Sequence, residues 1–285
     1  MDHPSRTGWA FSSPYVLFFL VFSVYPILFS FTLVFHRWNI ISPMHFIGAE
    51  NIRYLVHDPL FFKSLGNTFW FLAIHIPLQV AISLILANAL NERIRGVTFF
   101  RASFFLPVVI SGVVVTILWK YLYSTETGLI NALLLKLGGP KFPWLTSPTW
   151  AMPSIAVMAT WKNVGLYTVL FLAGLQGIPK HLYEAADLDG ASKLQQFLHI
   201  TVPVLNPIVV LVVILSTING FNLFIEPYVM TGGGPVNSTL SVVLYIYRQA
   251  FSFYKMGYAA TVGFALALMM LGVTLIQRRV LEREW

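Results

Sequence analysis

Long apolar stretches dominate the chain, and polar residues are concentrated in the segments between them. Six stretches hold enough apolar residues to cross a hydrocarbon core of roughly 30 Å, which takes about 20 helical residues. They cover residues 14–36, 66–90, 102–123, 150–175, 204–225 and 257–277. Because lipid offers backbone groups no hydrogen-bond partner, segments of this length are expected to be helices. The pattern predicts an all-α membrane protein with six transmembrane helices.

The first stretch follows Arg6 and could in principle be a signal peptide. It is too long for the apolar part of one, and no small-residue cleavage site follows it, so we interpret it as a retained span. The short turn that holds Arg93, Arg95 and Arg101 is the most basic connection, which favours a cytoplasmic turn and both termini inside. The predicted organisation is a tail at 1–13, a first span with an extracytoplasmic segment at 14–65, a five-span core at 66–277 and a tail at 278–285.

The composition supports a membrane protein and excludes several chemistries. Only 10% of the 285 residues are charged and 57% are hydrophobic, whereas soluble domains carry about 25% charged residues. The formal net charge of +7 does not indicate nucleic acid, because Lys and Arg are scattered and form no run. The absence of cysteine excludes disulfides and thiol chemistry. The seven histidines show no metal-ligand spacing, so we expect no metal.

The segment 177–203, between the fourth and fifth stretches, is polar and predicts a helix, a break and a second helix. Pro179 suits a first helical turn, and Asp189-Gly190 is a break signal because glycine adopts left-handed angles at low cost. A second helical piece, 191–200, runs into Pro203. The first helix would have a small apolar face formed by Leu182, Ala185, Ala186 and Leu188. Two interpretations stay open: a solvated connector, or an element that docks into a groove on a partner.

The residues of this segment resemble a known motif. Glu184-Ala185-Ala186, then Gly190, Ile200 and Pro203, resembles the EAA loop of binding-protein-dependent ABC permeases, with Val202 where leucine is usual. Further segments resemble the first permease subunit of maltose, lactose and glycerol-phosphate importers. They are Leu175-Gln176-Gly177-Ile178-Pro179, Asp189-Gly190-Ala191-Ser192, Met230-Thr231-Gly232-Gly233-Gly234-Pro235, Ser238-Thr239 and Tyr245-Ile246-Tyr247.

The resemblance implies a type I ABC importer fold in a bacterial inner membrane. It implies a second, homologous permease subunit, two cytoplasmic ATPase subunits and an extracytoplasmic substrate-binding protein as partners. The chain itself would be no enzyme and would bind no cofactor, since the partner ATPase uses ATP and Mg. This agrees with Gly232-Gly233-Gly234, which no Gly-Lys-Ser/Thr follows and which is therefore no phosphate-binding loop. The residues expected to couple to the ATPase are Glu184, Ala185, Ala186, Asp189, Gly190, Ile200 and Pro203.

Polar residues inside the predicted spans are candidates for a substrate path. The fifth span holds Ser216, Asn219 and Asn222, with Glu226 beyond them at helical spacing, and the second holds His75, Gln79 and Ser83. They either join helices by hydrogen bonds or face a water-filled cavity. In maltose-type relatives, the sugar site is built from the helices that match spans four and five, and Gly220 stands where those proteins carry an amide. The predicted path residues are Trp161, Lys162, Asn163, Tyr167, Ser216, Asn219 and Asn222.

Lys162 is the unusual residue of the fourth span. It lies roughly 18 Å deep at 1.5 Å per residue, whereas Glu226 is near the outer surface, so we predict that the two do not pair. Lys162 would snorkel, face a cavity or bind an acid of a partner subunit.

A secondary transporter or channel is a rival class, but it needs an intramembrane ion site, and every Asp and Glu lies outside the spans or at their ends. A membrane enzyme is a second rival, and no catalytic constellation supports it.

Overall fold

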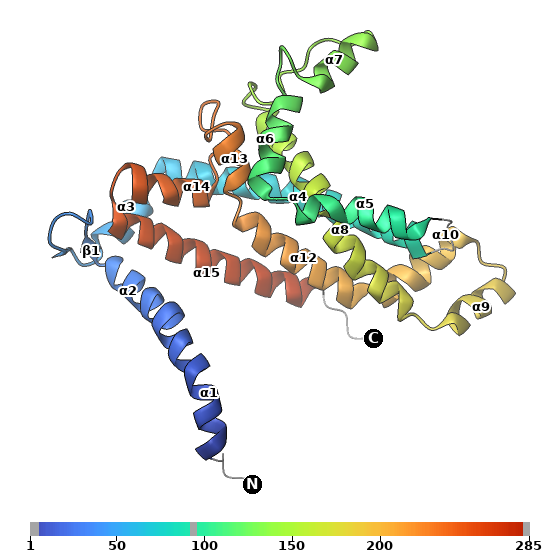
Figure 1. Cartoon of the computed structure of the whole chain (residues 1–285), viewed down its shortest axis with the longest axis horizontal. Helices are drawn as coiled ribbons and strands as arrows, with labels where there is room; N and C mark the ends of the chain where they lie inside the picture. Colours follow the sequence, from blue (N-terminus) through green and yellow to red (C-terminus); the bar gives the residue numbers. More distant parts are fainter. Residues whose placement is uncertain (1–5, 92–95, 282–285) are drawn as a thin grey trace. The chain divides into compact units, whose positions relative to one another are not determined.

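We describe a computed structural model of the chain, which is mostly helical. The structure describes residues 6–91 and 96–281 (Figure 1). The basic residues Arg93 and Arg95, on which the predicted orientation partly depends, lie outside the described residues. The chain divides into two compact units, which are described separately below. One comprises Met1–Phe61 with Tyr245–Ala267, and the other Phe62–Leu244 with Leu268–Trp285.

The predicted six spans correspond to four long helices and two bent pairs. Within the described ranges, the helices long and apolar enough to cross a membrane are Phe11–Leu33, Pro59–Asn91, Ala151–Gln176 and Met256–Leu281. The segments Thr98–Val109 and Gly112–Leu122 meet at 98°, and Lys193–Val204 and Asn206–Phe221 meet at 68° (Figure 1). The stretch predicted as the third span, 102–123, is therefore not one continuous helix, because Ile110 and Ser111 adopt extended backbone angles and break it. The fifth span ends at Phe221 rather than at residue 225.

In the first unit, one long apolar helix leads into a small hairpin. The helix comprises α1 (Arg6–Phe19), the π-helical turn η1 (Leu20–Val24) and α2 (Tyr25–Leu33). Only 6% of its most apolar window is buried within the chain, so most of its surface faces lipid or partners. The strands β1 (His36–Arg37) and β2 (His45–Phe46) then pair antiparallel, with His36 opposite Phe46.

A buried aspartate organises the rest of the first unit. Asp58 lies directly before α4 (Pro59–Asn91), and one of its carboxylate oxygens accepts a hydrogen bond from the Leu60 backbone N–H at 2.9 Å. The other oxygen accepts from the hydroxyls of Tyr245 and Tyr258. The carboxylate therefore caps the start of α4 and ties it to α14 (Val242–Tyr247) and α15 (Met256–Leu281), with the π turn η3 (Arg248–Ser252) between these two helices. The helix α3 (Glu50–Leu55) is held to the hairpin by Asn51, whose amide donates to Val34 O and His36 O.

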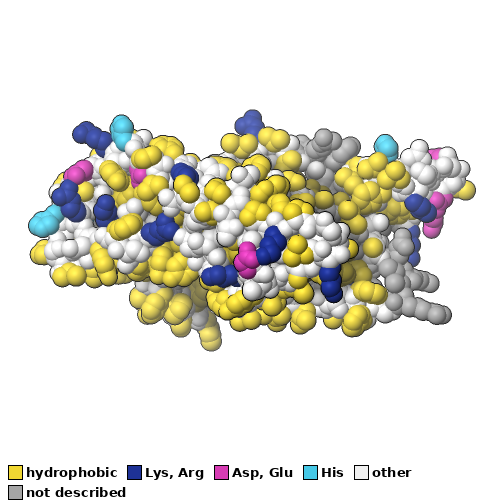
Figure 2. Space-filling view, turned by 90° about the horizontal axis from the view of Figure 1, so that it is seen from above, with side chains coloured by type: hydrophobic (Ala, Val, Ile, Leu, Met, Phe, Trp, Pro, Cys, Tyr) yellow, Lys and Arg dark blue, Asp and Glu magenta, His cyan; other side chains and the backbone are white. Residues whose placement is uncertain are grey.

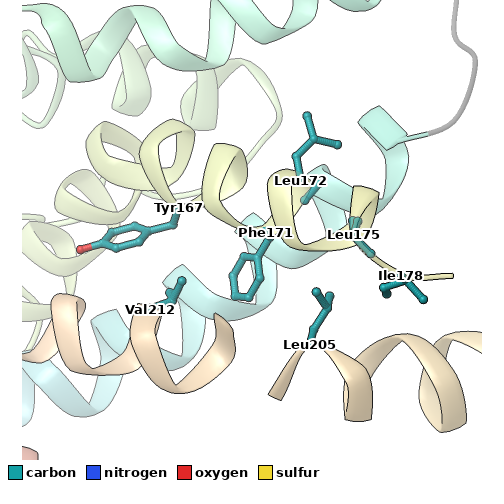
Figure 3. Packing of buried hydrophobic residues seen from close by; sticks show 8 residues of the cluster. Tyr167, Phe171, Leu172, Leu175, Ile178, Leu205 and Val212 are labelled. Carbon is teal, nitrogen blue, oxygen red and sulfur yellow. The ribbon is translucent and has the colours of Figure 1, made fainter. Parts of the chain in front are cut away.

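The second unit is built around α8 (Ala151–Gln176), the most buried of the long helices, with 61% of its most apolar window inside the chain. It packs against α5 (Val97–Val109), α12 (Asn206–Phe221) and α6 (Gly112–Leu122). A cluster of buried apolar side chains joins α8 to α12 (Figure 3). Its members are Ala87, Tyr167, Phe171, Leu172, Leu175, Ile178, Leu205 and Val212. This core supports both the loop that follows α8 and the polar cavity described below.

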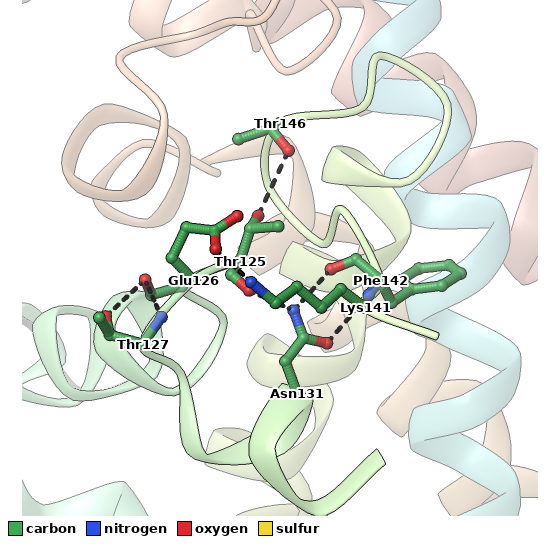
Figure 4. Close-up of polar contacts among 8 residues, drawn as sticks. Thr125, Glu126, Thr127, Asn131, Lys141, Phe142 and Thr146 are labelled. Carbon is green, nitrogen blue, oxygen red and sulfur yellow. Dashed lines mark hydrogen bonds and ion pairs between the residues drawn. The ribbon is translucent and has the colours of Figure 1, made fainter. Parts of the chain in front are cut away.

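The segment between α6 and α8 holds α7 (Leu129–Lys136) and is organised by one amide (Figure 4). Asn131 is 1% exposed. It donates to Thr125 O and Phe142 O, each at 3.0 Å. It also accepts from Phe142 N and from the Trp144 indole N–H. Because a single side chain hydrogen-bonds four partly buried groups, this connection is an ordered structure rather than a loose loop.

Candidate functional site

The segment 177–203 forms two helical pieces joined by a tight turn. The first is α9 (Lys180–Leu188), preceded by Pro179 in an extended conformation rather than in the first helical turn. After α9, Gly190 has φ +74°, the Gly190 N–H bonds Asp187 O at 3.2 Å, and the Ala191 N–H bonds Ala186 O at 2.9 Å. This pair of bonds is a Schellman motif, which requires a left-handed residue where Gly190 stands. The predicted break is confirmed.

The second piece begins with a capping box. The Ser192 hydroxyl accepts from Gln195 N, and the Gln195 amide oxygen accepts from Ser192 N. These bonds satisfy the first donors of α10 (Lys193–Gln196). The chain then continues without a break through the π turn η2 (Phe197–Thr201) and α11 (Val202–Val204), which contains Pro203, a residue that has no N–H to donate. The helix therefore passes through Ile200 and Pro203 and bends only where α12 begins.

A polar network that the sequence analysis missed closes the turn. The Asp187 carboxylate accepts from the Gln196 amide and lies 3.1 Å from the Lys193 ammonium. The Gln196 hydrogen bond and then Lys193 hold the pKa of Asp187 below its ordinary value of 3.8. Gln196 also donates to Ala191 O at 3.1 Å, and it is 3% exposed. The two pieces are thus fixed to one another by side chains as well as by the turn. In the sequence, this network is indicated only by the spacing of six residues between Asp187 and Lys193.

The apolar residues of α9 differ in their exposure. Leu182 packs against the buried core cluster, and Ala186 is half-buried, whereas Ala185 and Leu188 are exposed. The Leu188 side chain is 90% exposed, and Leu194 and Leu198 on the second piece are 68% and 52% exposed. Glu184 is exposed, with no ion pair among the described residues. The exposed surface of this loop therefore carries three acids, Glu184, Asp187 and Asp189, together with the apolar side chains of Ala185, Leu188, Leu194 and Leu198.

A polar cavity of about 300 Å³ lies within the second unit, among α4, α8, α12 and α13 (Ile225–Met230). Four residues of the predicted path line it, namely Lys162, Asn163, Asn219 and Asn222. The full lining is Phe71, His75, Ala159, Lys162, Asn163, Asn219, Gly220, Asn222, Leu223, Ile225 and Glu226.

The prediction that Lys162 and Glu226 do not pair is wrong. The Lys162 ammonium lies 3.1 Å from a carboxylate oxygen of Glu226, and the two side chains are 17% and 11% exposed. Glu226 belongs to α13, a separate short helix, and not to the face of α12. Because α12 ends at Phe221, the chain turns and brings Glu226 against α8. The break before α6 also brings the backbone close to the Lys162 side chain, since a Cβ at Gly112 would lie 2.9 Å from Lys162 Nζ.

The other predicted path residues lie outside the cavity lining. The amide of Asn219 donates to the Tyr167 hydroxyl at 3.1 Å, so Tyr167, which is 1% exposed, supports a lining residue from behind. Trp161 packs against Trp119, with ring centroids 5.3 Å apart and the ring planes tilted by 58°. Ser216 is fully buried, and its hydroxyl has no hydrogen-bond partner among the described residues. The structure thus brings four of the seven predicted residues together.

The polar residues of α4 fit the interhelical alternative. His75 Nδ1 lies 2.8 Å from the Thr160 hydroxyl of α8, and the Ser83 hydroxyl bonds Val164 O. Gln79 donates to Ser83 at 3.0 Å. Gly220 lines the cavity, and because a Cβ there would lie 2.3 Å from Leu72 Cδ2, an amide side chain at this position would require the Leu72 side chain to shift.

Comparison with known proteins decides the family. The profile of the binding-protein-dependent transport system inner membrane components matches residues 79–284. The chain belongs to this family. Two curated relatives are each 38% identical to this permease. The arabinooligosaccharide transport system permease protein AraP of Bacillus subtilis aligns over 95% of this chain and 87% of its own length. The lactose transport system permease protein LacF of Rhizobium radiobacter aligns over 95% and 92%.

The fold of this permease is also that of a solved importer. A chain in the crystal structure of a bacterial alginate ABC transporter, in complex with an alginate-pentasaccharide-bound periplasmic protein, matches with a TM-score of 0.82. The match covers 97% of this chain and 96% of that one, at 23% sequence identity. The chain therefore has the type I ABC importer permease fold, and it is a multi-pass membrane protein of the inner-membrane component family.

Proposed function

We propose that this permease subunit forms half of the import path for a sugar or a sugar-like solute. The observation that carries the proposal is the cavity lined by Asn163, Asn219 and Asn222 beside the Lys162–Glu226 pair. Hydroxyl-rich solutes need amide and charged partners in place of water. The Asn163 side chain lines the cavity with no hydrogen-bond partner among the described residues. The names of the two relatives, which specify arabinooligosaccharides and lactose, support the same substrate class.

The energy for import comes from partner subunits. A second, homologous permease subunit completes the path, an extracytoplasmic binding protein delivers the solute, and two ATPase subunits consume ATP and Mg. The loop 177–203 and both termini are cytoplasmic. The ATPase receives the patch of Ala185, Leu188, Leu194 and Leu198, and Glu184 pairs there with a basic residue. Exposed leucines of this kind in water are costly unless a partner covers them, which supports docking over a solvated connector.

Uptake by path variants tests the first half of the proposal. Asn163→Leu and Asn219→Leu should lower uptake of labelled lactose or arabinooligosaccharide by tenfold or more in cells that express the whole transporter. Membrane levels and assembly should stay near normal. Trp161→Leu is the matched control, because it changes the neighbouring residue outside the cavity lining, and it should retain uptake. Normal uptake by both asparagine variants would refute the path, and uptake that persists without ATP would favour a secondary transporter.

ATPase stimulation tests the coupling. Gly190→Val forces a β-branched residue to φ +74°, at a cost of about 1–2 kcal/mol or more. Ala185→Trp adds bulk at an exposed position without disturbing the core. Both should abolish substrate-stimulated ATP hydrolysis or detach the ATPase. Gly138→Val is the matched control, since Gly138 has φ +80° at the end of α7, away from the loop. Equal loss in the control would mean that backbone strain alone, rather than docking, explains the result.

A further inference from the structure

A large cavity among the described residues lies in the first unit and has no part in the proposed path. Its volume is about 690 Å³, and it is formed by the β1–β2 hairpin, α3 and the start of α15. We call it the hairpin groove. Its walls are aromatic and basic, and the residues that matter below are Arg37, Trp38, Arg53, Tyr54 and Lys255. Figure 2 shows Lys, Arg and His side chains gathered at the end of the view where β1 and α3 lie.

The groove carries two cations that no acid compensates. Arg37 is paired with Glu50 at 2.7 Å. Arg53 and Lys255 have no carboxylate partner among residues 6–91 and 96–281. The Lys255 ammonium instead lies 5.8 Å from the centroid of the Tyr54 ring, a contact that orients the cation but leaves its charge in place. An anion in the groove would therefore meet a guanidinium and an ammonium that are both available for charge-assisted hydrogen bonds.

The aromatic wall of the groove continues onto an exposed apolar helix. Trp38 packs edge-on against Phe29 of α2, with ring centroids 5.9 Å apart, and its carbonyl accepts from Met256 N at the start of α15. Along α2, Ile27, Leu28 and Phe31 are 51–60% exposed. The groove thus lies beside the end of α2, part of an apolar helix long enough to cross a membrane. Trp, Tyr, Lys and Arg are the residues that favour this interfacial level.

We propose that the hairpin groove binds the headgroup of an anionic phospholipid. Arg53 and Lys255 hold the phosphate, Trp38 and Tyr54 flank the glycerol, and the acyl chains follow the exposed face of α2. The phosphate chemistry alone would also suit a soluble phosphate ester. The continuous apolar surface from Trp38 to α2 favours the lipid, because a soluble ester would leave that surface uncovered. The two uncompensated cations disfavour zwitterionic lipids, whose own ammonium they would repel.

Native mass spectrometry of the full chain in mixed nanodiscs provides the test. With phosphatidylglycerol and phosphatidylcholine in equal amounts, the chain should retain phosphatidylglycerol preferentially. Arg53→Gln should lower that retention about tenfold, the loss expected for one charge-assisted hydrogen bond. Lys255→Gln should act in the same direction, and Arg53→Lys should restore part of the retention. Lys136→Gln is the matched control, since it removes one exposed charge from the end of α7, and it should change nothing.

Three results would overturn the proposal. Equal retention of the two lipids would remove the charge preference. Full displacement of phosphatidylglycerol by millimolar glycerol phosphate would reassign the groove to a soluble ester. Unchanged retention in Arg53→Gln and Lys255→Gln, with the circular dichroism spectrum and thermal midpoint of the wild type, would show that the lipid lies elsewhere on the chain.

Discussion

The Lys162–Glu226 pair offers a quantitative test of the bundle. Its side chains are 17% and 11% exposed and 3.1 Å apart, beside a cavity of about 300 Å³. Glu226→Gln would leave a nearly buried ammonium without its counter-ion, and Lys162→Met would leave a carboxylate. Removing one partner of a fully buried pair costs about 3–5 kcal/mol. Because the cavity admits some water, we expect about 2 kcal/mol for each single variant.

The double variant should destabilise the chain by less than the sum of the two single variants. With both charges gone, the remaining cost is lost shape and hydrogen bonding, about 1 kcal/mol. The interaction energy from the double-mutant cycle should then be about 3 kcal/mol. Each single variant should lower the thermal midpoint of the chain in detergent by about 4–8 °C, followed by tryptophan fluorescence. Glu226→Asp keeps the charge and should recover part of the loss.

A second ion pair of this chain is the matched control. Lys141 and Glu126 are the same residue types, but their side chains are 42% and 72% exposed. The cycle with Lys141→Met and Glu126→Gln should give an interaction energy below about 1 kcal/mol. Additive effects at Lys162 and Glu226, or an equal interaction energy at the exposed pair, would refute the reasoning that burial makes the inner pair strong.

Three further predictions address single elements. The pKa of the Asp187 carboxyl is lowered in the folded loop, so its contribution is complete above its ordinary value of 3.8 and is lost as pH falls through the lower folded pKa. Hydrogen exchange of 186–196 should therefore be constant from pH 7 to 5 and accelerate, after correction for intrinsic rates, only below about pH 4, and Asp187→Asn should abolish that step. Asn131→Leu should destabilise the 124–149 segment by about 2–4 kcal/mol, seen as faster local exchange, because several buried partners lose their hydrogen bonds. Single cysteines at Ser192 and Val236 should label from opposite sides of the membrane; Val236 is 75% exposed and is a better probe than the neighbouring Ser238, whose hydroxyl is buried.

The segment 177–203 was the most predictable part of the chain because its signals are local. The glycine in Asp189-Gly190 predicted a left-handed residue, and Gly190 has φ +74°. Ser192 and Gln195 have the spacing of a capping box, so the start of α10 was also readable from the sequence. The apolar face of α9 was less predictable. Which of its residues face outward depends on the core cluster that receives Leu182, and that cluster is assembled from distant segments.

The position of Glu226 could not be obtained by counting residues along a span. The depth argument assumed that each apolar stretch is one straight helix, so that Lys162 and Glu226 lay at different levels. The chain instead bends by 98° between α5 and α6 and starts a new helix at Ile225. Both interruptions bring backbone and side chains to Lys162, as the close approach of Gly112 shows. The wrong prediction about the Lys162–Glu226 pair and the unpredicted break in the third stretch thus have one cause, which is the assumption of straight helices.

The interruptions also explain why the cavity lies where it does. In a membrane, a helix end inside the bundle leaves polar backbone groups that only protein or cavity water can satisfy. The end of α12 is such a place: Asn222 N and its side-chain amide both donate to Ile218 O, and the Ser241 hydroxyl donates to Leu223 O. The cavity around this end is lined by Asn219, Asn222 and Glu226. Ser216, one turn earlier in the unbroken helix, is fully buried in the core. In this permease, the place where a span is interrupted therefore predicts the position of the polar cavity better than a polar stripe along a helix does.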